Sequence, residues 1–159
     1  MSLDTFQAGW KSLGYSLRDD DGSNGTVLGV HWRPTGTDGK NLTRSSARKA
    51  YYDPAAGRPN LDILVNNYVA KINIRRDDDN ARAVGVDIIS RSNSTRLTIT
   101  AKREVILAAG AIHTPQILQL SGIGPSSLLN KLNITVVKDL PGVGANLQDH
   151  PALGLRYDC

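Results

Sequence analysis

Cysteine is almost missing from this chain, and long apolar runs are missing altogether. The single cysteine, Cys159, is the last residue, which excludes a disulfide framework or a metal site built from cysteines. No apolar run approaches the roughly 20 residues that a helix needs to span a bilayer. Residues 1–16 also lack the basic start and apolar core of a secretory signal. Aromatic residues make up only 5% of the chain, so an aromatic-rich core is excluded as well.

Charge of one sign does not gather anywhere along the chain. The formal net charge is +4, but lysine and arginine are scattered among acidic residues, which argues against a nucleic-acid or membrane-surface partner. The sequence contains four Asn-Xaa-Ser/Thr sequons, which begin at Asn24, Asn41, Asn93 and Asn133. Such sequons accept N-linked sugars in secreted proteins. They leave open a glycosylated, secreted parent whose signal peptide lies outside this sequence, and localisation stays open.

The first 60 residues show little periodicity. A length of 159 residues fits one ordinary domain. Apolar spacing predicts a short helix at Leu3–Leu13, and Val27–Trp32 is typical of a strand. A helical pattern follows at Ser45–Tyr52, which Asp53-Pro54 is expected to end because the residue before a proline is pushed out of the α region.

From Leu61 onward the sequence is rich in β patterns. Apolar and polar residues alternate in several short runs, which predicts strands with one buried face. The polar stretch Arg91–Thr95 between two of these runs predicts an antiparallel hairpin. The expected strands contain the alternating runs Leu61–Val65, Ile72–Ile74, Val84–Ile88 and Leu97–Ile99.

The segment that follows predicts a strand, a turn and two short helices. Glu104–Ala108 is apolar enough for a strand covered on both faces, and the next residues are small enough for a ligand or backbone to approach closely. Thr114 and Pro115 favour a helix start, and Gly122 favours a left-handed helix stop. A second helix through Leu128–Leu132 and a strand at Ile134–Val137 are expected next. Taken alone, these signals fit a strand, turn and helix of any α/β protein.

The complete string is more specific than its parts. It reads E-V-I-L-A-A-G-A-I-H-T-P-Q-I-L-Q-L-S-G-I-G-P at 104–125, then D-L-P-G-V-G-A-N-L-Q-D-H-P at 139–151. This closely resembles the glucose-methanol-choline (GMC) family of flavin-dependent alcohol oxidoreductases, in their second signature and the segment after it. The resemblance extends more weakly upstream to about residue 25, through R-S-S-A-R-K-A-Y, N-N-Y-V-A-K-I and A-V-G-V-D.

The resemblance implies an α/β fold with α+β character, in which this chain is part of the FAD-binding lobe of a two-lobed flavoenzyme. Residues 1–44 would belong to the substrate lobe or a connecting region, and residues 45–159 to an FAD-binding domain incomplete at both ends. FAD is the implied cofactor. Val69 matches a valine whose backbone pairs with the adenine ring, and the small-residue bend at Ala109 and Gly110 would pack beside the nucleotide end of the flavin. No metal site is expected.

The resemblance also shows which parts are missing from this sequence. A G-x-G-x-x-G loop for the cofactor diphosphate does not occur, since Gly142 and Gly144 form only G-x-G. In the family that loop would lie before Met1, and the catalytic histidine beyond Cys159. His31, His113 and His150 do not match the catalytic position, although an acid–base pair of Asp149 and His150 remains an alternative to a turn. No catalytic residue is therefore assigned, and tight FAD binding by this chain alone is not expected.

Three functional hypotheses remain from the sequence. The first is a fragment of an FAD-dependent oxidoreductase acting on CH–OH groups, in which hydride passes from a small-molecule alcohol to flavin while a base takes the hydroxyl proton. The second is a GMC-fold protein with non-oxidative or lost activity. The third is a small secreted β-rich binding module. Fold does not fix the substrate, so sugars, aryl alcohols, choline and short alkanols all stay open, as do the electron acceptor and the oligomeric state.

Overall fold

The computed structural model describes residues 3–18, 25, 28–31, 35–77 and 80–151. The chain divides into two compact units, Met1–Asp62 and Ile63–Cys159, and each is described by itself. Helices and an antiparallel sheet occur together, which confirms the expected mixed fold. The predicted boundary near residue 44 between a substrate lobe and an FAD-binding lobe concerns a larger protein and stays a prediction.

The first unit begins with the predicted helix. Helix α1 spans Leu3–Ser12. Phe6 and Trp10 meet edge to face with ring centroids 6.0 Å apart, and Trp10 meets Tyr15 in the same way at 5.2 Å. The predicted strand Val27–Trp32 lies partly outside the described residues. Within it, Val30 forms an isolated parallel bridge with Leu17.

The predicted helix at Ser45–Tyr52 is present, but its predicted end is wrong. A π-helical turn, η1, covers Arg48–Tyr52, and a 3₁₀ turn, η2, continues through Asp53–Ala55. Asp53 keeps right-handed helical angles (φ −55°, ψ −41°) although a proline follows it. Pro54 sits in the first turn of η2, where a missing N–H costs no hydrogen bond, so the chain tightens there instead of leaving the helix.

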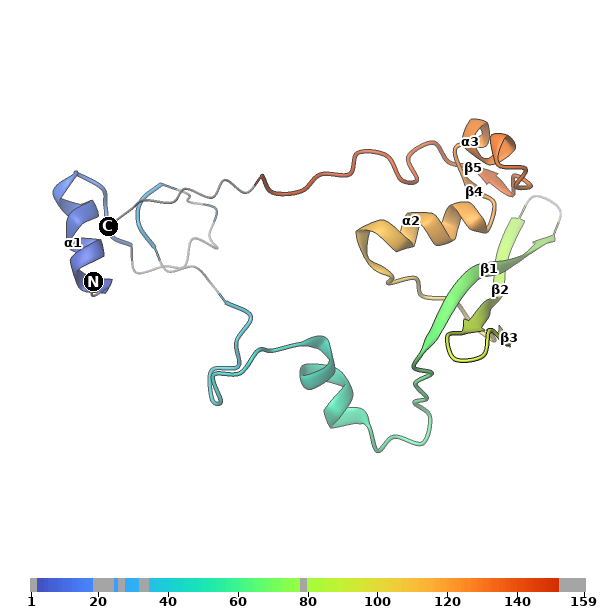
Figure 1. Ribbon diagram of the computed structural model, residues 1–159, viewed down its shortest axis with the longest axis horizontal. Coiled ribbons are helices and arrows are strands. Elements are labelled where there is room, and N and C mark those ends of the chain that lie inside the picture. Colours follow the sequence, from blue (N-terminus) through green and yellow to red (C-terminus); the bar gives the residue numbers. More distant parts are fainter. Residues whose placement is uncertain (1–2, 19–24, 26–27, 32–34, 78–79, 152–159) are drawn as a thin grey trace. The chain divides into compact units, whose positions relative to one another are not determined.

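The second unit is built on a three-stranded antiparallel sheet in the order β1–β2–β3 (Figure 1). The strands are β1 (Asn67–Asp77), β2 (Asn80–Ser90) and β3 (Arg96–Thr100). The predicted hairpin through Arg91–Thr95 is confirmed as the β2–β3 connection, where Ser90 donates its N–H to the Thr95 carbonyl at 2.9 Å. Cross-strand pairing places Val69, Ile88 and Leu97 in one row.

Two predicted strands are wrong. Leu61–Val65 and Glu104–Ala108 have no regular secondary structure and belong to no sheet. Among the described residues, no strand pairs with either segment. Val65 is 71% exposed and Ile106 80% exposed. The pattern that predicts a buried face needs a partner that the described structure does not supply.

The helical segment after the sheet differs in detail from the prediction. Helix α2 spans Gly110–Leu120 with Ala109 as its N-cap, and Pro115 lies inside it. The prediction that Thr114 is the N-cap is therefore wrong. The Thr114 hydroxyl instead accepts the Ala109 N–H at 3.1 Å, so it reaches back across the first turn of a helix that starts earlier.

After α2, one predicted helix is present and one predicted strand lies elsewhere. The second predicted helix is confirmed as α3 (Ser126–Lys131), which follows the short strand β4 (Ile123–Gly124). The predicted strand at Ile134–Val137 is wrong, because pairing with β4 begins directly after that segment, at β5 (Lys138–Asp139), in a parallel arrangement. Gly122, predicted to be left-handed, has φ +83°. Its carbonyl accepts the N–H groups of Val137 and Lys138 at 2.8 and 3.1 Å, which sets where β5 can begin.

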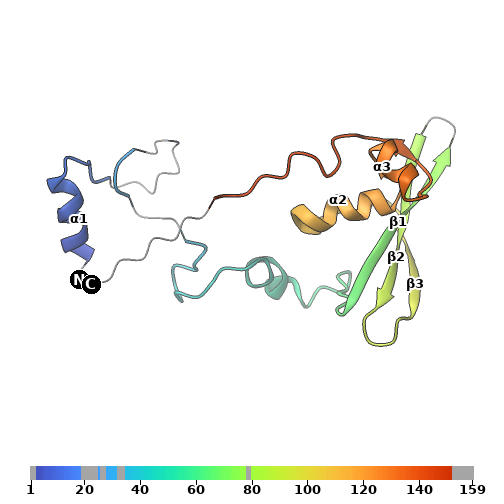
Figure 2. The ribbon, with the colours of Figure 1, turned by 45° about the horizontal axis from the view of Figure 1, so that its top comes forward.

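Helix α2 packs against β1, and the few buried apolar side chains of the second unit lie on these elements and their neighbours. In both ribbon views the helix ends close to the middle of β1, with α3, β4 and β5 gathered at that same end (Figures 1 and 2). The buried apolar residues described are Ile72, Ile88, Ile117 and Leu129. The core is therefore small and is centred on the junction between α2 and the sheet.

Candidate functional site

The predicted cofactor bend forms the start of helix α2. Ala109 is the N-cap residue, and Gly110 is the first helical residue with φ +82°. A Cβ added to Gly110 would meet nothing within 4 Å, so the space beside it is open. Helix N-termini also present backbone N–H groups with a partial positive charge. This bend therefore leaves open space beside the backbone at Gly110, and cofactor contact at Ala109 and Gly110 stays a prediction.

Val69 lies on β1, which is an edge strand of the described sheet. Its pairing with Ile88 is followed by a register shift before Lys71, and such bulges twist and re-aim a strand. The Val69 side chain is 40% exposed. An edge strand presents unpaired N–H and C=O groups on its outer side, which is the backbone arrangement that reading an adenine edge would require.

A junction at Ser121 and Gly122 ties α2 to β1. Ser121 is only 8% exposed, and its hydroxyl accepts the Ile72 N–H at 2.8 Å while donating to the Ile117 carbonyl at 2.6 Å. A Cβ added to Gly122 would overlap the Thr135 carbonyl oxygen, so only glycine fits there. The two elements that carry the predicted contact points are thereby joined in one packed unit.

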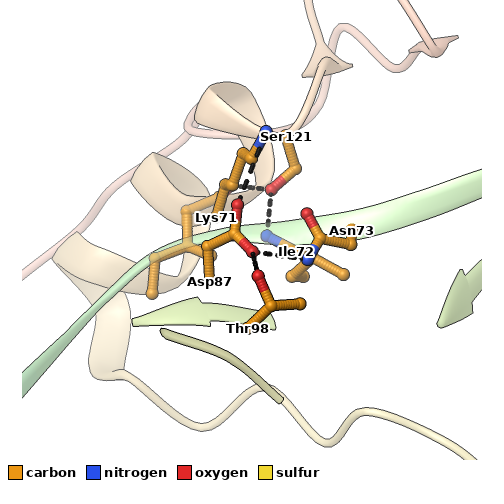
Figure 3. Close-up of polar contacts among 7 residues, drawn as sticks. Lys71, Ile72, Asn73, Asp87, Thr98 and Ser121 are labelled. Atoms are coloured by element: carbon orange, nitrogen blue, oxygen red, sulfur yellow. Dashed lines mark hydrogen bonds and ion pairs between the residues drawn. The ribbon is translucent and has the colours of Figure 1, made fainter. Parts of the chain in front are cut away.

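A carboxylate holds the three strands together on the other side of β1 (Figure 3). Asp87 on β2 accepts hydrogen bonds from Asn73 of β1 at 2.7 Å and from Thr98 of β3 at 2.8 Å, and Lys71 lies 3.6 Å from it. The hydrogen bond from Asn73, then that from Thr98, holds the pKa of Asp87 below its ordinary value. The cluster links side chains of the three strands, and each member has a structural partner.

A surface hollow runs along α2. Gln119 holds the following loop to the helix by donating to the Val143 carbonyl at 3.2 Å, and Gly144 lies so close to Gln119 that a Cβ there would be 2.8 Å from its side-chain nitrogen. Val69, Ala109 and Gly110 do not line this hollow, so it is not a groove shared by the predicted cofactor contacts. The lining residues are Ala111, Ile112, Pro115, Gln116, Gln119 and Gly144–Gln148.

The histidines supply no acid–base pair in the described contacts. Asp149 accepts the backbone N–H of His150 at 2.7 Å, which is a turn contact and not a contact to the imidazole ring. The His113 ring shares a hydrogen bond with Gln116 at 2.9 Å. His31 is half-buried, and its Nδ1 has no hydrogen-bond partner within the described structure.

Two further classes of site find no support among the described residues. No group of three or more His, Cys, Asp or Glu side chains that could hold a metal ion occurs there. In the same residues, no helix is long and apolar enough to cross a membrane.

Sequence reasoning missed Ser121 and Asp87. Ser121 stands inside the quoted motif, but its partner Ile72 is 49 residues away, and nothing local marks it as a bridging residue. Asp87 lies in a strand whose alternation was predicted correctly. It follows Val86 and precedes Ile88, so its side chain is expected on the face of the sheet opposite to theirs. Which polar residues it would meet depends on register, and register is set by two bulges in the β1–β2 pairing.

Comparison with known proteins agrees with this architecture. Residues 2–152 match the family description "GMC oxidoreductase". The chain is 46% identical over 137 residues to the dehydrogenase xptC of Emericella nidulans, covering 86% of this chain and 21% of that protein. It is 47% identical over 116 residues to an oxygen-dependent choline dehydrogenase of Serratia proteamaculans, covering 73% and 20%.

Solved structures give the same result. A fungal aryl-alcohol oxidase superposes with a TM-score of 0.81 at 36% identity, covering 91% of this chain and 23% of that one. An FAD-dependent oxidoreductase from Chaetomium thermophilum gives a TM-score of 0.77 at 41% identity, covering 87% and 23%. The chain spans about a fifth of the length of the curated relatives it matches. The chain belongs to the GMC oxidoreductase family.

Proposed function

We propose that this chain forms the central part of the FAD-binding lobe of a larger GMC oxidoreductase, which oxidises a small-molecule alcohol to a carbonyl compound. The observation that carries the proposal is the family match over residues 2–152 together with the superposition on FAD-dependent relatives. Among the similar proteins, the printed names include a choline dehydrogenase and an aryl-alcohol oxidase. A neutral or cationic alcohol is therefore the substrate class proposed here.

The described residues fit the adenine-nucleotide part of FAD. Gly110 leaves open space beside a helix start, and β1 presents an outer edge at Val69. We assign Val69, Ala109 and Gly110 to cofactor contact through their backbone. When bound, FAD supplies the acceptor for hydride, while these residues only bind and orient it. The base that takes the substrate proton is not assigned to any residue of this chain.

The first experiment separates the chain from its parent. Purified chain is expected to retain no tightly bound flavin, and so to show no flavin absorbance and no alcohol-dependent dye reduction, since the sequence contains no G-x-G-x-x-G loop. The coding sequence on either side of this chain is expected to encode that loop upstream and a histidine-bearing segment downstream. A yellow and active preparation of this chain alone, or flanking sequence without both features, would contradict the proposal.

A second experiment tests the assigned residues in the longer protein. Gly110→Val is expected to lower bound FAD, because a branched side chain would fill the open space and strain a residue at positive φ. Gly142→Val is the matched control, since a Cβ at Gly142 meets nothing within 4 Å and Gly142 is not among the residues of positive φ. Equal flavin content in the two variants would contradict the assignment of Gly110 to cofactor contact.

Of the two alternative hypotheses, family membership affects one and not the other. Family membership leaves no role for a small β-rich binding module unrelated to flavoenzymes. A GMC-fold protein with non-oxidative or lost activity remains the second candidate, because the chain itself carries no assigned catalytic residue. The longer protein distinguishes the two: bleaching of its flavin by an alcohol under anaerobic conditions supports oxidation, and stable flavin colour across choline, aryl alcohols, sugars and short alkanols supports the second candidate.

We also propose that the parent is a secreted glycoprotein. Of the four sequon asparagines in this chain, Asn41, Asn93 and Asn133 are exposed, and Asn24 lies outside the described residues. Secretion from a eukaryotic host followed by enzymatic removal of N-linked sugars is expected to lower the apparent mass. An unchanged mass would count against this proposal and would leave the oxidoreductase proposal intact.

A further inference from the structure

Ser121 makes a contact that termination of its own helix does not require. It is the C-cap residue of α2, and its backbone N–H already reaches the Ile117 and Leu118 carbonyls at 3.0 Å each. The hydroxyl adds a second bond to the Ile117 carbonyl and, through its oxygen, accepts the Ile72 N–H of β1. A buried backbone N–H without an acceptor is costly, so Ile72 depends on this hydroxyl more than α2 does.

The contact lies on the outer edge of β1. Because β1 is the last strand of the described sheet on that side, its outward N–H groups have no neighbouring strand there. Ser121 takes the outward N–H at Ile72, and Val69 lies three positions earlier, on the other side of the register shift. The serine therefore fixes the edge directly after the bulge, close to the backbone groups assigned to cofactor contact.

The strand is held from its inner side as well. Lys71 and Asn73, which flank Ile72, both reach Asp87 of β2, as Figure 3 shows. Three successive residues of β1 are therefore held, Lys71 and Asn73 through their side chains and Ile72 through its backbone. Of these contacts, the Ser121 bond is the one that relates β1 to helix α2.

We propose that Ser121 is a positioning residue, which holds the outer edge of β1 in the orientation that lets the Val69 backbone pair with an adenine ring. This inference rests on the proposed FAD-binding function. It assigns to Ser121 no contact with cofactor or substrate. Its effect passes through the Ile72 N–H, so it predicts a local change at β1 and not a general loss of folding.

The test uses the full 159-residue chain labelled with ¹⁵N, with ADP as the probe at millimolar concentration. Two readouts are measured by NMR: hydrogen exchange at the Ile72 amide, and the ADP-induced shift of the Val69 amide. FMN, which has a phosphate but no adenine, is the control ligand. Ser121→Ala removes the hydroxyl, Ser121→Thr keeps it, and Ser127→Ala changes an exposed serine of α3.

In Ser121→Ala, exchange at Ile72 is expected to rise about tenfold, the size of effect that loss of one hydrogen bond produces. Exchange at Ile88 in the sheet core is expected to change much less. The ADP-induced shift at Val69 is expected to fall at least twofold. Ser121→Thr and Ser127→Ala are expected to match the wild-type chain in both readouts, and FMN is expected to leave Val69 unshifted.

The possible failures are distinguishable. Unchanged Ile72 exchange in Ser121→Ala overturns the role of Ser121. An equal rise at Ile72 and Ile88 also overturns it, because it shows general destabilisation. An ADP shift at Val69 that is the same in wild type and Ser121→Ala overturns the positioning role alone. No shift at Val69 in the wild-type chain, with Ile72 exchange responding as expected, overturns the adenine site and with it the assignment of Ser121 to cofactor positioning.

Discussion

The two units of this chain differ most in what they bury. In the unit from Ile63 onward, Ile72, Ile88, Ile117 and Leu129 are buried beneath a sheet and two helices. Among the residues from Asp4 to Asp62 whose burial the structure describes, none is buried. The contrast is physical, because burial of apolar surface is the main favourable contribution to folding and must exceed the entropy lost on ordering the chain.

The difference in burial between the two units also affects which unit can hold a candidate site in a fixed geometry. The residues proposed to contact the cofactor, Val69, Ala109 and Gly110, lie in the second unit, on elements joined by the buried Ser121 bond. The first unit contributes local contacts, such as the aromatic group around Trp10. A site held by buried contacts keeps its geometry without a ligand, whereas exposed local contacts leave more freedom. The following variants test this comparison, beginning with the largest expected effect.

Gly122→Ala is expected to destabilise the second unit most, by about 4 kcal/mol. A side chain there would overlap the Thr135 carbonyl and would hold alanine at φ +83°, and both effects are destabilising. Urea unfolding followed by far-UV circular dichroism measures the loss. Gly142→Ala is the control and is expected to stay within about 0.5 kcal/mol of wild type. Similar values for the two variants would mean that the Ser121–Gly122 junction does not organise this unit.

Leu129→Ala is expected to cost about 3 kcal/mol in the same measurement. Its side chain is fully buried at 0% exposure, and removing a buried leucine leaves a cavity. Leu132→Ala, on a side chain that is 56% exposed at the end of α3, is expected to cost less than about 1 kcal/mol. If the two leucines prove equivalent, the small core described around α3 is not a core in solution.

The sequence predicts the sheet better than the segments that flank it. Alternation gives β1, β2 and β3 and the hairpin between the last two, because those strands pair with their neighbours in sequence. The same alternation fails at Leu61–Val65, and the apolar run at Glu104–Ala108 fails too, because neither segment finds a partner in the described structure. A periodic pattern shows that one face of a segment is apolar. Whether the segment forms a strand depends on whether it pairs with another strand in the folded protein.

The candidate site is predictable only in part, for a related reason. Ala109, Gly110 and Val69 come from a resemblance carried by a contiguous motif and by a strand pattern. The Ser121–Ile72 bond spans 49 residues, and the Asp87 cluster depends on bulges in the strand register. Helix starts show the same limit locally: Thr114 carries a strong N-cap preference, yet the open turn at Gly110 lets α2 begin one turn earlier.

Asp87→Asn is expected to have a smaller effect, which depends on pH. Hydrogen bonds from Asn73 and Thr98 lower the pKa of Asp87 in the folded chain below its ordinary value of 3.8. Ionised Asp87 therefore stabilises the fold at pH values above its unfolded pKa, and this contribution disappears as the pH falls through the lower folded pKa. Urea unfolding at pH 5 and pH 2.5 is expected to show a larger loss of stability on acidification for wild type than for Asp87→Asn.

Asp38→Asn is the matched control from the other unit. Backbone N–H groups of Lys40 and Asn41 lower the pKa of Asp38 in the same direction, but the carboxylate stabilises only a local turn. Its substitution is expected to leave the acid response of the sheet signal unchanged. An identical acid response in wild type and Asp87→Asn would show that the strand cluster does not depend on the charge of Asp87.

Phe6→Ala is expected to have the smallest effect, below about 1 kcal/mol, because the ring it removes is 49% exposed and makes one described aromatic contact, with Trp10. Both tryptophans, Trp10 and Trp32, lie in the first unit, so indole fluorescence reports on that unit separately from the sheet. In wild type, this signal is expected to change at lower urea concentration, and over a broader range, than the circular dichroism of the sheet. Phe6→Ala is expected to shift only the fluorescence transition. Coincident transitions that move together in Phe6→Ala would show instead that the two units unfold as one, and that the first is stabilised by more than its local contacts.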